Sequence, residues 1–258
     1  GTMRTKALLA ATVLVAAAGV PGVAAAHPIV NGTEHEFGEE VAYDMIFPVA
    51  LGASYTYFWD TFWAPRSGGQ IHHATDIMAP KMTPVVATVD GTIGFVNWSR
   101  NPNVPNWDRC CNLTIDHDDG WSSWYIHLNN DTPGTDDGLA WGIAPGIEPG
   151  VRVKAGQLVG WVGDSGNAEN TGPHLHYELR DPEGIIVNPY ESLVAAPRID
   201  LRVKCFGEYV TLLGSPEADD LVGTDGDDVI HGRGGDDVID GGGGNDLICG
   251  GSGHDTLK

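Results

Sequence analysis

The sequence is poor in basic residues: 14 Lys and Arg stand against 35 Asp and Glu, which gives a formal net charge of −21 over 258 residues. Phosphate binding requires clustered Lys and Arg, so this balance argues against nucleic acid as a partner. It is typical of an acidic exported protein or of a protein that binds cations. Hydrophobic residues make up 41% of the chain, which is enough for a folded core.

Long apolar runs are also scarce. Only Ala7–Val20 is almost wholly apolar; it follows two basic residues and precedes three alanines. Residues 1–26 are therefore predicted to be a secretory signal peptide, with residues 1 and 2 taken as an artefact and the mature chain beginning near His27. The run is shorter than the roughly 20 residues of a membrane span, which disfavours an uncleaved anchor. We expect a secreted, extracellular protein with no membrane segment after cleavage.

Cysteine is sparse, with four residues in the chain. In an exported protein this number favours disulfides over metal thiolates. Cys205–Cys249 is the favoured pair, since both residues flank or lie within the C-terminal tail. Cys110 and Cys111 are neighbours whose side chains would point to opposite faces of a regular strand, so their state is left undecided.

The apolar spacing of a long helix is missing too. From about residue 43 to residue 197, short Val-, Ile- and aromatic-rich segments alternate with Gly, Pro, Asn and Asp, which predicts β-structure. The strands are expected at Thr83–Val89, Gly91–Trp98, Cys111–Asp116, Trp121–His127 and Gln157–Val162. The turn-rich run 129–149 predicts a surface loop that borders the functional groove.

Two short segments contain pairs of residues suited to metal chemistry. His72 and Asp76 are four apart, so a strand or a tight bend places both side chains on one face. His174 and His176 are two apart, so on a strand they project together while Leu175 points back to the core.

A third segment ends in a lone histidine, His127. Two imidazoles and one carboxylate form a standard catalytic zinc shell, with the fourth position left for water. Zinc polarises a scissile carbonyl and activates its water, while further imidazoles can act as a base or a hydrogen-bond donor. The three segments together predict metal-assisted hydrolysis of an amide, whereas either pair alone is weak evidence.

The order HxxxD, YxHL and GWVGDSGNAENTGPHLHYEL resembles the M23 family of zinc metallopeptidases, the lysostaphin-like peptidoglycan endopeptidases. The resemblance covers about residues 45–195. It implies Zn²⁺ as the catalytic metal, with His72, Asp76 and His176 as its ligands. It implies that His127 and His174 position or deprotonate the attacking water and stabilise the oxyanion.

The match departs from the family pattern at two positions that remove no ligand. Ala74 stands where the family usually has Gly, and Gln70 stands where Arg is common. The adjacent His73 is expected to face away from the site.

The last 45 residues form a nonapeptide repeat. Gly recurs at every ninth position from Gly214 to Gly250, and the eighth position of each unit is aliphatic: Leu221, Ile230, Ile239, Ile248 and Leu257. The sixth position is always aspartate: Asp219, Asp228, Asp237, Asp246 and Asp255. Eleven acids against two bases give residues 214–258 a net charge of −9.

This pattern resembles the haemolysin-type (RTX) calcium-binding repeat, which builds a parallel β-roll. The resemblance implies Ca²⁺ held by turn carbonyls and by these five aspartates, with the aliphatic residues filling the interior. Without the cation, charge repulsion in a Gly-rich segment should hold it open, and the alternative is a disordered acidic tail.

The sequence thus predicts a mainly β protein: an antiparallel β-sheet zinc peptidase domain and a short parallel β-roll. The expected boundaries are signal peptide 1–26, N-terminal arm 27–44, M23-like domain 45–195, linker 196–213 and repeats 214–258. The expected function is hydrolysis of peptide bonds in peptidoglycan cross-links, with peptidoglycan peptides as partners and no predicted oligomeric state. The alternatives are a non-hydrolytic wall-binding or regulatory module, and a calcium-dependent adhesin or matrix protein.

Overall fold

The computed structural model describes residues 35–50, 56–97, 110–169 and 171–258, so the predicted signal peptide lies outside the described residues. This part of the chain is mainly β, with one short α-helix, α1 (Tyr190–Ala195). The mainly β prediction is confirmed. Within these ranges, no helix is both long enough and apolar enough to cross a bilayer.

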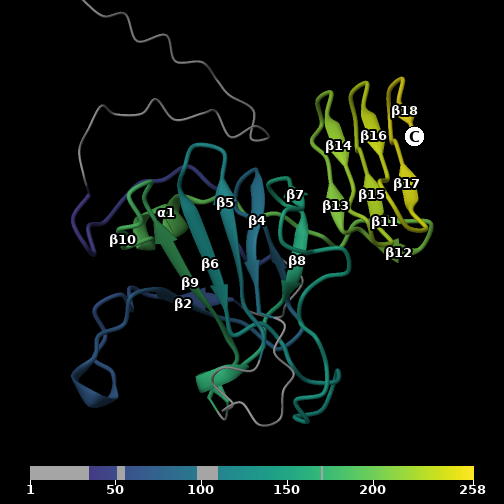
Figure 1. Cartoon of the computed structure of the whole chain (residues 1–258). Coiled ribbons are helices and arrows are strands. Elements are labelled where there is room, and N and C mark those ends of the chain that lie inside the picture. Colours follow the sequence, from purple (N-terminus) through teal and green to yellow (C-terminus); the bar gives the residue numbers. More distant parts are fainter. Residues whose placement is uncertain (1–34, 51–55, 98–109, 170) are drawn as a thin grey trace, which may run out of the picture.

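An eight-stranded antiparallel sheet forms the body of the protein, with the strand order β1-β2-β9-β6-β5-β4-β7 and with β10 paired to β9 (Figure 1). Its strands are β1 (Tyr57–Phe58), β2 (Thr75–Met78), β4 (Gly91–Val96), β5 (Leu113–His117), β6 (Ser122–Ile126), β7 (Arg152–Val153), β9 (His174–Arg180) and β10 (Ile186–Val187). A separate antiparallel pair joins β3 (Pro84–Val86) and β8 (Leu158–Trp161).

The two faces of the large sheet differ because side chains alternate along each strand. Leu175 of β9 is opposite Ile77 of β2, and Tyr177 of β9 is opposite Tyr125 of β6. All four are fully buried, so this face covers the core. The alternate residues of β2 and β9 therefore project from the other face.

The core also takes in residues on both sides of the range 45–195. Val41 and Tyr43 pack into it from the N-terminal side. Leu201, Cys205 and Val210 pack into it from the segment that leads to the repeats.

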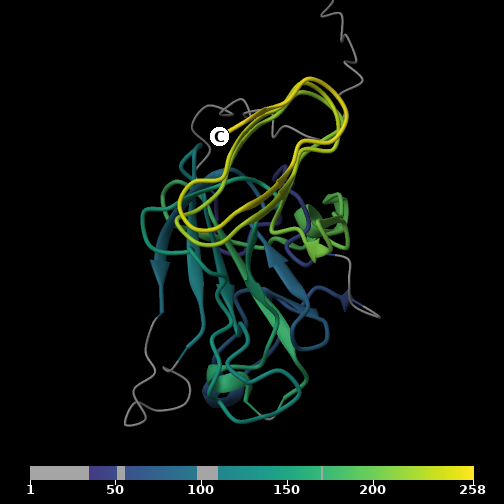
Figure 2. The ribbon, with the colours of Figure 1, turned by 90° about the vertical axis from the view of Figure 1, so that its right-hand side faces the viewer.

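The repeats form the predicted parallel β-roll, in which two three-stranded sheets face each other and the coils stack (Figure 2). The strands alternate between the sheets: β13 (Leu212–Leu213), β15 (Val229–His231) and β17 (Leu247–Cys249) in one, β14 (Asp220–Val222), β16 (Val238–Asp240) and β18 (Thr256–Leu257) in the other.

The interior of the roll is filled by aliphatic side chains from both sheets. Leu221, Ile230 and Ile239 are buried there, Ile248 packs against them, and Leu212 extends this interior before the first repeat. Leu257 is 49% exposed. The prediction that every eighth residue fills the interior is wrong at this position, because no described coil packs over Leu257.

The favoured disulfide is confirmed. Cys205 and Cys249 are bonded, with their Cα atoms 5.8 Å apart. The bond ties the hairpin of β11 (Lys204–Cys205) and β12 (Glu208–Tyr209) to β17. Cys110 and Cys111, which the sequence left undecided, are bonded to each other.

Truncation of this buried interior should destabilise the roll. We expect Ile239→Ala to lower the free energy of unfolding of the calcium-loaded roll by about 2–5 kcal/mol, because Ile239 is fully buried in a narrow interior. The exposed Leu257 is the matched control, and Leu257→Ala should change the free energy of unfolding by less than about 0.5 kcal/mol. Denaturant unfolding monitored by circular dichroism measures both, and equal effects would contradict the assignment of the interior.

A buried histidine makes the fold sensitive to acid. The imidazole of His117 lies between two hydroxyls, with Nδ1 2.9 Å from the Tyr43 hydroxyl and Nε2 2.8 Å from Ser123 Oγ. Burial lowers the pKa of His117 to about 4 from its ordinary 6.5. Between these two values the unfolded chain binds a proton that the folded chain does not.

Stability should therefore fall as pH drops from 6.5 towards 4. The expected contribution of His117 is about 3 kcal/mol over this window, at about 1.4 kcal/mol for each pKa unit. We expect His117→Gln to be less stable at pH 7 but to lose less stability on acidification. Urea titrations at pH 7 and pH 5 measure this difference, and an unchanged pH dependence in the variant would contradict it.

Candidate active site

The first predicted residues meet at the start of β2. The Nδ1 atom of His72 lies 2.7 Å from the carbonyl oxygen of Thr61, so Nδ1 carries the proton and Nε2 presents a lone pair. Asp76 Oδ1 lies 3.1 Å from this Nε2 atom. The backbone N–H of Asp76 donates to Thr61 Oγ1 at 2.9 Å, so Thr61 orients the His72 ring and holds the backbone of Asp76.

The third residue comes from the neighbouring strand. His176 of β9 is in register with Asp76 of β2, so the two side chains share a face of the sheet. His176 Nδ1 lies 2.9 Å from His72 Nε2 and 2.9 Å from Asp76 Oδ1. The other ring nitrogen, Nε2, lies 3.4 Å from Glu178 Oε1, which favours a proton on Nε2 and a lone pair on Nδ1.

Three acceptor atoms therefore converge at one point. Two unprotonated imidazole nitrogens and a carboxylate cannot all hydrogen-bond to one another, because none of them carries a proton. One cation can bind all three. His72, Asp76 and His176 form such a metal-compatible group. Their ligand atoms are 2.9 to 3.1 Å apart. Ligands at about 2.0–2.1 Å from a tetrahedral zinc ion are about 3.3 Å apart, so the residues present fit zinc.

The charges of this group are strongly coupled. Burial alone would raise the pKa of Asp76, but hydrogen bonds with His176 and His72 lower it well below its usual range. Burial alone would lower the pKa of His176, but hydrogen bonds with Asp76 and Glu178 raise it. The pocket therefore favours a positive charge beside Asp76, a charge that a proton or a metal ion can supply.

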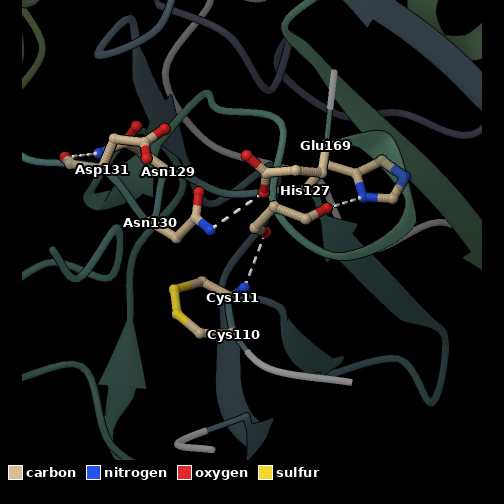
Figure 3. The surroundings of a disulfide bond; sticks show 8 residues. Cys110, Cys111, His127, Asn129, Asn130, Asp131 and Glu169 are labelled. Carbon is tan, nitrogen blue, oxygen red and sulfur yellow. Dashed lines mark hydrogen bonds between the residues drawn. A yellow bond between two sulfur atoms is a disulfide. The ribbon is translucent and has the colours of Figure 1, made fainter. Parts of the chain in front are cut away.

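The two remaining predicted histidines lie beside this group. The rings of His127 and His174 are 4.9 Å apart, and His174 Nε2 is 3.8 Å from Asp76 Oδ1. His127 Nδ1 lies 2.8 Å from the Ser165 carbonyl oxygen (Figure 3), and His174 Nδ1 lies 2.7 Å from that of Gly172. Both Nδ1 atoms donate to backbone, which leaves each Nε2 atom as an acceptor.

The backbone around Gly163 joins these two histidines. Its N–H donates to the carbonyl of His127 at 3.0 Å, and its carbonyl accepts from the N–H of His174 at 2.9 Å. Burial lowers the pKa of His127 to about 3, and repulsion from His176 and His174 adds to this effect. His127 is therefore a neutral imidazole at neutral pH.

The structure thus brings all five predicted residues together, but sequence reasoning missed their supports. The carbonyls of Thr61, Ser165 and Gly172 have no signal in the sequence because any residue provides a carbonyl. Glu178 had a signal: it follows His176 by two positions on one strand and therefore shares its face. Arg66, whose Nη2 atom is 3.7 Å from Asp76 Oδ2, was also missed.

The predicted bystander His73 lies outside the site, as its position next to His72 suggests. Its ring packs 5.0 Å from Phe37 and 6.4 Å from Phe62.

A second group of acids lies in the loop 129–149 and beside it, and includes Asp131 and Asp136. The ammonium of Lys81 sits 2.6 Å from Asp131 Oδ2, 2.7 Å from Asp136 Oδ1 and 2.8 Å from Asp164 Oδ1. Lys81 therefore supplies the positive charge at this position, and its hydrogen bonds to these carboxylates raise its pKa against the effect of burial. The group anchors the loop rather than offering a vacant cation site.

The vicinal disulfide lies close to His127. The N–H of Cys111 donates to Ser165 Oγ at 2.8 Å, while the carbonyl of the same serine accepts from His127 (Figure 3). Ser165 is therefore held from both sides. Asn130 contributes a longer contact, from Nδ2 to Glu169 Oε2 at 3.5 Å.

The repeat aspartates form two columns along the edges of the roll. The Oδ1 atoms of Asp237, Asp255 and Asp246 each accept from the N–H of the aspartate 18 residues earlier, which links Asp219, Asp237 and Asp255 on one edge and Asp228 and Asp246 on the other. Asp237 Oδ2 is buried without a hydrogen-bond partner, and burial raises the pKa of this carboxyl. A hard oxygen in that position fits a calcium ligand.

Both the sheet domain and the repeat tail match families of known proteins. A family model described as Peptidase family M23 matches residues 70–189, and one described as RTX calcium-binding nonapeptide repeat (4 copies) matches residues 213–257.

Individual relatives match the first part. The L-Ala--D-Glu endopeptidase of Bacillus subtilis (strain 168) is 30% identical over 169 residues, which are 61% of this chain and 45% of that protein. The peptidoglycan DD-endopeptidase ShyC of Vibrio cholerae is 33% identical over 124 residues, 47% of this chain and 23% of that protein. The chain thus spans less than half the length of either relative.

Among solved structures, a putative glycyl-glycine endopeptidase lytM from Ruminococcus gnavus is 29% identical, with a TM-score of 0.46 and coverage of 61% of this chain and 63% of that chain. The catalytic domain of lysostaphin from Staphylococcus simulans is 25% identical, with a TM-score of 0.38 and coverage of 55% and 92%.

Metal binding tests the convergent group directly. We expect the purified protein to hold one zinc ion at this site, and His176→Ala to abolish its binding. Glu178→Gln should lower zinc affinity by about 10- to 100-fold, because Glu178 orients His176 without contacting the ion. His73→Ala is the matched control and should bind zinc like the wild type. Competition titration with a zinc indicator measures all three, and tight zinc binding by His176→Ala would contradict the assignment.

Proposed function

We propose that this chain, which belongs to peptidase family M23 through residues 70–189, is a zinc-dependent endopeptidase that hydrolyses peptide bonds in bacterial peptidoglycan. One observation carries the proposal. Three acceptor atoms of His72, Asp76 and His176 converge on one point of a sheet face, with the rings of two further buried histidines beside them.

In this proposal His72 Nε2, Asp76 Oδ1 and His176 Nδ1 hold the zinc ion. When bound, zinc supplies a Lewis acid that polarises the scissile carbonyl and acidifies a water molecule. The one negative charge of Asp76 leaves a net positive site that suits an electron-rich carbonyl oxygen. Thr61 and Glu178 keep the two ligand rings from rotating, through the contacts to His72 Nδ1 and His176 Nε2.

His127 and His174 act on protons. Each ring donates through Nδ1 to a backbone carbonyl and presents the Nε2 lone pair, so each can accept a proton from the attacking water. A ring that has taken this proton becomes a donor, which can stabilise the developing oxyanion or protonate the leaving nitrogen. His127 is neutral at neutral pH, so its Nε2 lone pair can accept a hydrogen bond from the water, while its lowered pKa makes it a weak base.

The substrate class is inferred from the relatives. The name of the Bacillus subtilis relative describes cleavage of L-Ala–D-Glu bonds, and that of the Vibrio cholerae relative describes cleavage of DD-peptide bonds. A further relative, the glycyl-glycine endopeptidase ALE-1 of Staphylococcus capitis, is named for glycyl-glycine bonds. These bonds differ in stereochemistry but all are amides, which one zinc site can serve. Peptidoglycan peptides are therefore the proposed partners. The repeats and the wall-hydrolase relatives support action outside the cytoplasmic membrane, at an extracellular or periplasmic site.

The tail is proposed to bind Ca²⁺ through Asp219, Asp228, Asp237, Asp246 and Asp255 together with turn carbonyls. The match to the RTX nonapeptide repeat and the orphaned, buried oxygen of Asp237 support this assignment.

Digestion of purified cell walls tests the peptidase. The zinc-loaded full chain should release amino groups from peptidoglycan, and His176→Ala should be inactive. His174→Ala should retain zinc but lose about 10²- to 10⁴-fold in rate, the usual contribution of a general acid–base residue. His73→Ala should retain the full rate. Equal release of amino groups by the wild type and His176→Ala would contradict the peptidase proposal and favour a wall-binding or adhesive role.

A further inference from the structure

The sheet β13-β15-β17 of the roll packs directly against the peptidase domain. Leu213, Val229 and Leu247 of the roll pack against the apolar cluster that forms the core of the domain. The N–H of Thr211 donates to the carbonyl of Val229 at 2.7 Å, and the carbonyl of Thr211 accepts from the N–H of Leu158 at 2.8 Å. Backbone hydrogen bonding therefore runs from the roll through Thr211 into β8 (Figure 1).

A second contact joins the repeat turn 223–228 to the loop 129–149. Gly146 has a φ of +74°, and a Cβ atom added there would collide with Thr224 Oγ1. A Cβ atom added at Gly226 would lie 3.0 Å from the nitrogen of Gly146. The two backbones meet at a distance that only glycine permits.

Asp228 connects the two contacts. Its Oδ2 atom accepts from the N–H and the hydroxyl of Thr224, at 2.6 and 2.8 Å. Its Oδ1 atom accepts from the hydroxyl of Thr211 at 2.9 Å. A carboxylate proposed as a calcium ligand thus holds Thr211 and Thr224, one residue from each of these two contacts.

Strand β8 leads from this interface to the catalytic histidines. Leu158, which bonds to Thr211, begins the strand, and Gly163 lies just beyond its other end. Gly163 bonds to the backbone of both His127 and His174. At about 3.3 Å per residue, the span from Leu158 to Gly163 is about 16 Å.

We propose that calcium activates the peptidase, because calcium-loaded repeats dock on β8 and hold the backbone of His127 and His174 in place. The net charge of −9 over residues 214–258 opposes folding of the coils, and bound calcium removes that repulsion. The roll is then a two-state element, docked with calcium and released without it. The catalytic consequence rests on the proposed peptidase function, whereas the docking itself does not.

The test uses the full chain, loaded with zinc in metal-depleted buffer, and titrates calcium without a chelator that would compete for zinc. Hydrogen exchange is followed at the amides of Leu158, Gly163 and His174, and peptidoglycan hydrolysis is followed in parallel. We expect calcium to slow exchange at all three amides. We expect it to raise the hydrolysis rate by about 5- to 150-fold, the usual range for coupled sites, with the same midpoint.

Two glycine variants separate docking from backbone strain. Gly146 and Gly150 have φ values of +74° and +91°, so alanine is strained at either position. A side chain at Gly146 would strike Thr224, whereas nothing lies within 4 Å of one at Gly150. We expect Gly146→Ala to require several-fold more calcium before the Leu158 amide is protected from hydrogen exchange. We expect Gly150→Ala to keep the calcium midpoint of the wild type.

Slower exchange within residues 214–258 alone, with Leu158 and Gly163 unchanged, would show that the roll folds independently and would overturn the proposal. An unchanged midpoint in Gly146→Ala would also contradict it. If calcium protects Leu158 and Gly163 but no condition hydrolyses peptidoglycan, the docking stands and the proposed peptidase function fails. If hydrolysis occurs at a rate independent of calcium, the activation is refuted and the peptidase stands.

Discussion

The site depends on three imidazole N–H groups that donate to backbone carbonyls. His72, His127 and His174 each direct Nδ1 at a carbonyl oxygen, at 2.7 to 2.8 Å. A buried donor without a partner would cost about 1–3 kcal/mol, so each bond fixes both the tautomer and the ring plane. As a consequence, each of the three rings keeps an Nε2 lone pair, and those of His72 and His174 lie 3.1 and 3.8 Å from Asp76 Oδ1. The roles assigned to these three histidines require those lone pairs to be available.

The register between β2 and β9 is the second constraint. Asp76 is directly opposite His176, and Ile77 is directly opposite Leu175. A slip of one residue would bury the metal-compatible side chains and expose the apolar ones, so the core and the site specify the same pairing. The buried tyrosine pair Tyr125 and Tyr177 repeats this arrangement one strand further on. Stability and function are therefore not separable in these central strands.

Sequence reasoning reached what is encoded by periodicity. Alternation placed Leu175 in the core and both flanking histidines on the opposite face of the strand, and the nine-residue period located the aliphatic interior of the roll. It did not reach the contacts that backbone atoms make across long separations. The Thr61 carbonyl beside His72 is one example, and the Thr211 bridge between Leu158 and the roll is another. The path of an irregular segment decides such contacts, and no side-chain pattern records that path.

Each coil of the roll spans 18 residues, so successive nonapeptides lie on alternate edges and the two edges are not equivalent. The column that contains Asp228 faces the enzyme, while the column that contains Asp237 lies on the opposite edge. Insertion or loss of a single nonapeptide between Thr211 and Asp228 would therefore exchange the edges and bring the wrong turn to Gly146. A change of two nonapeptides would restore the phase. We therefore expect this segment to tolerate a change in length only by an even number of nonapeptides, because each full coil of the roll contains two.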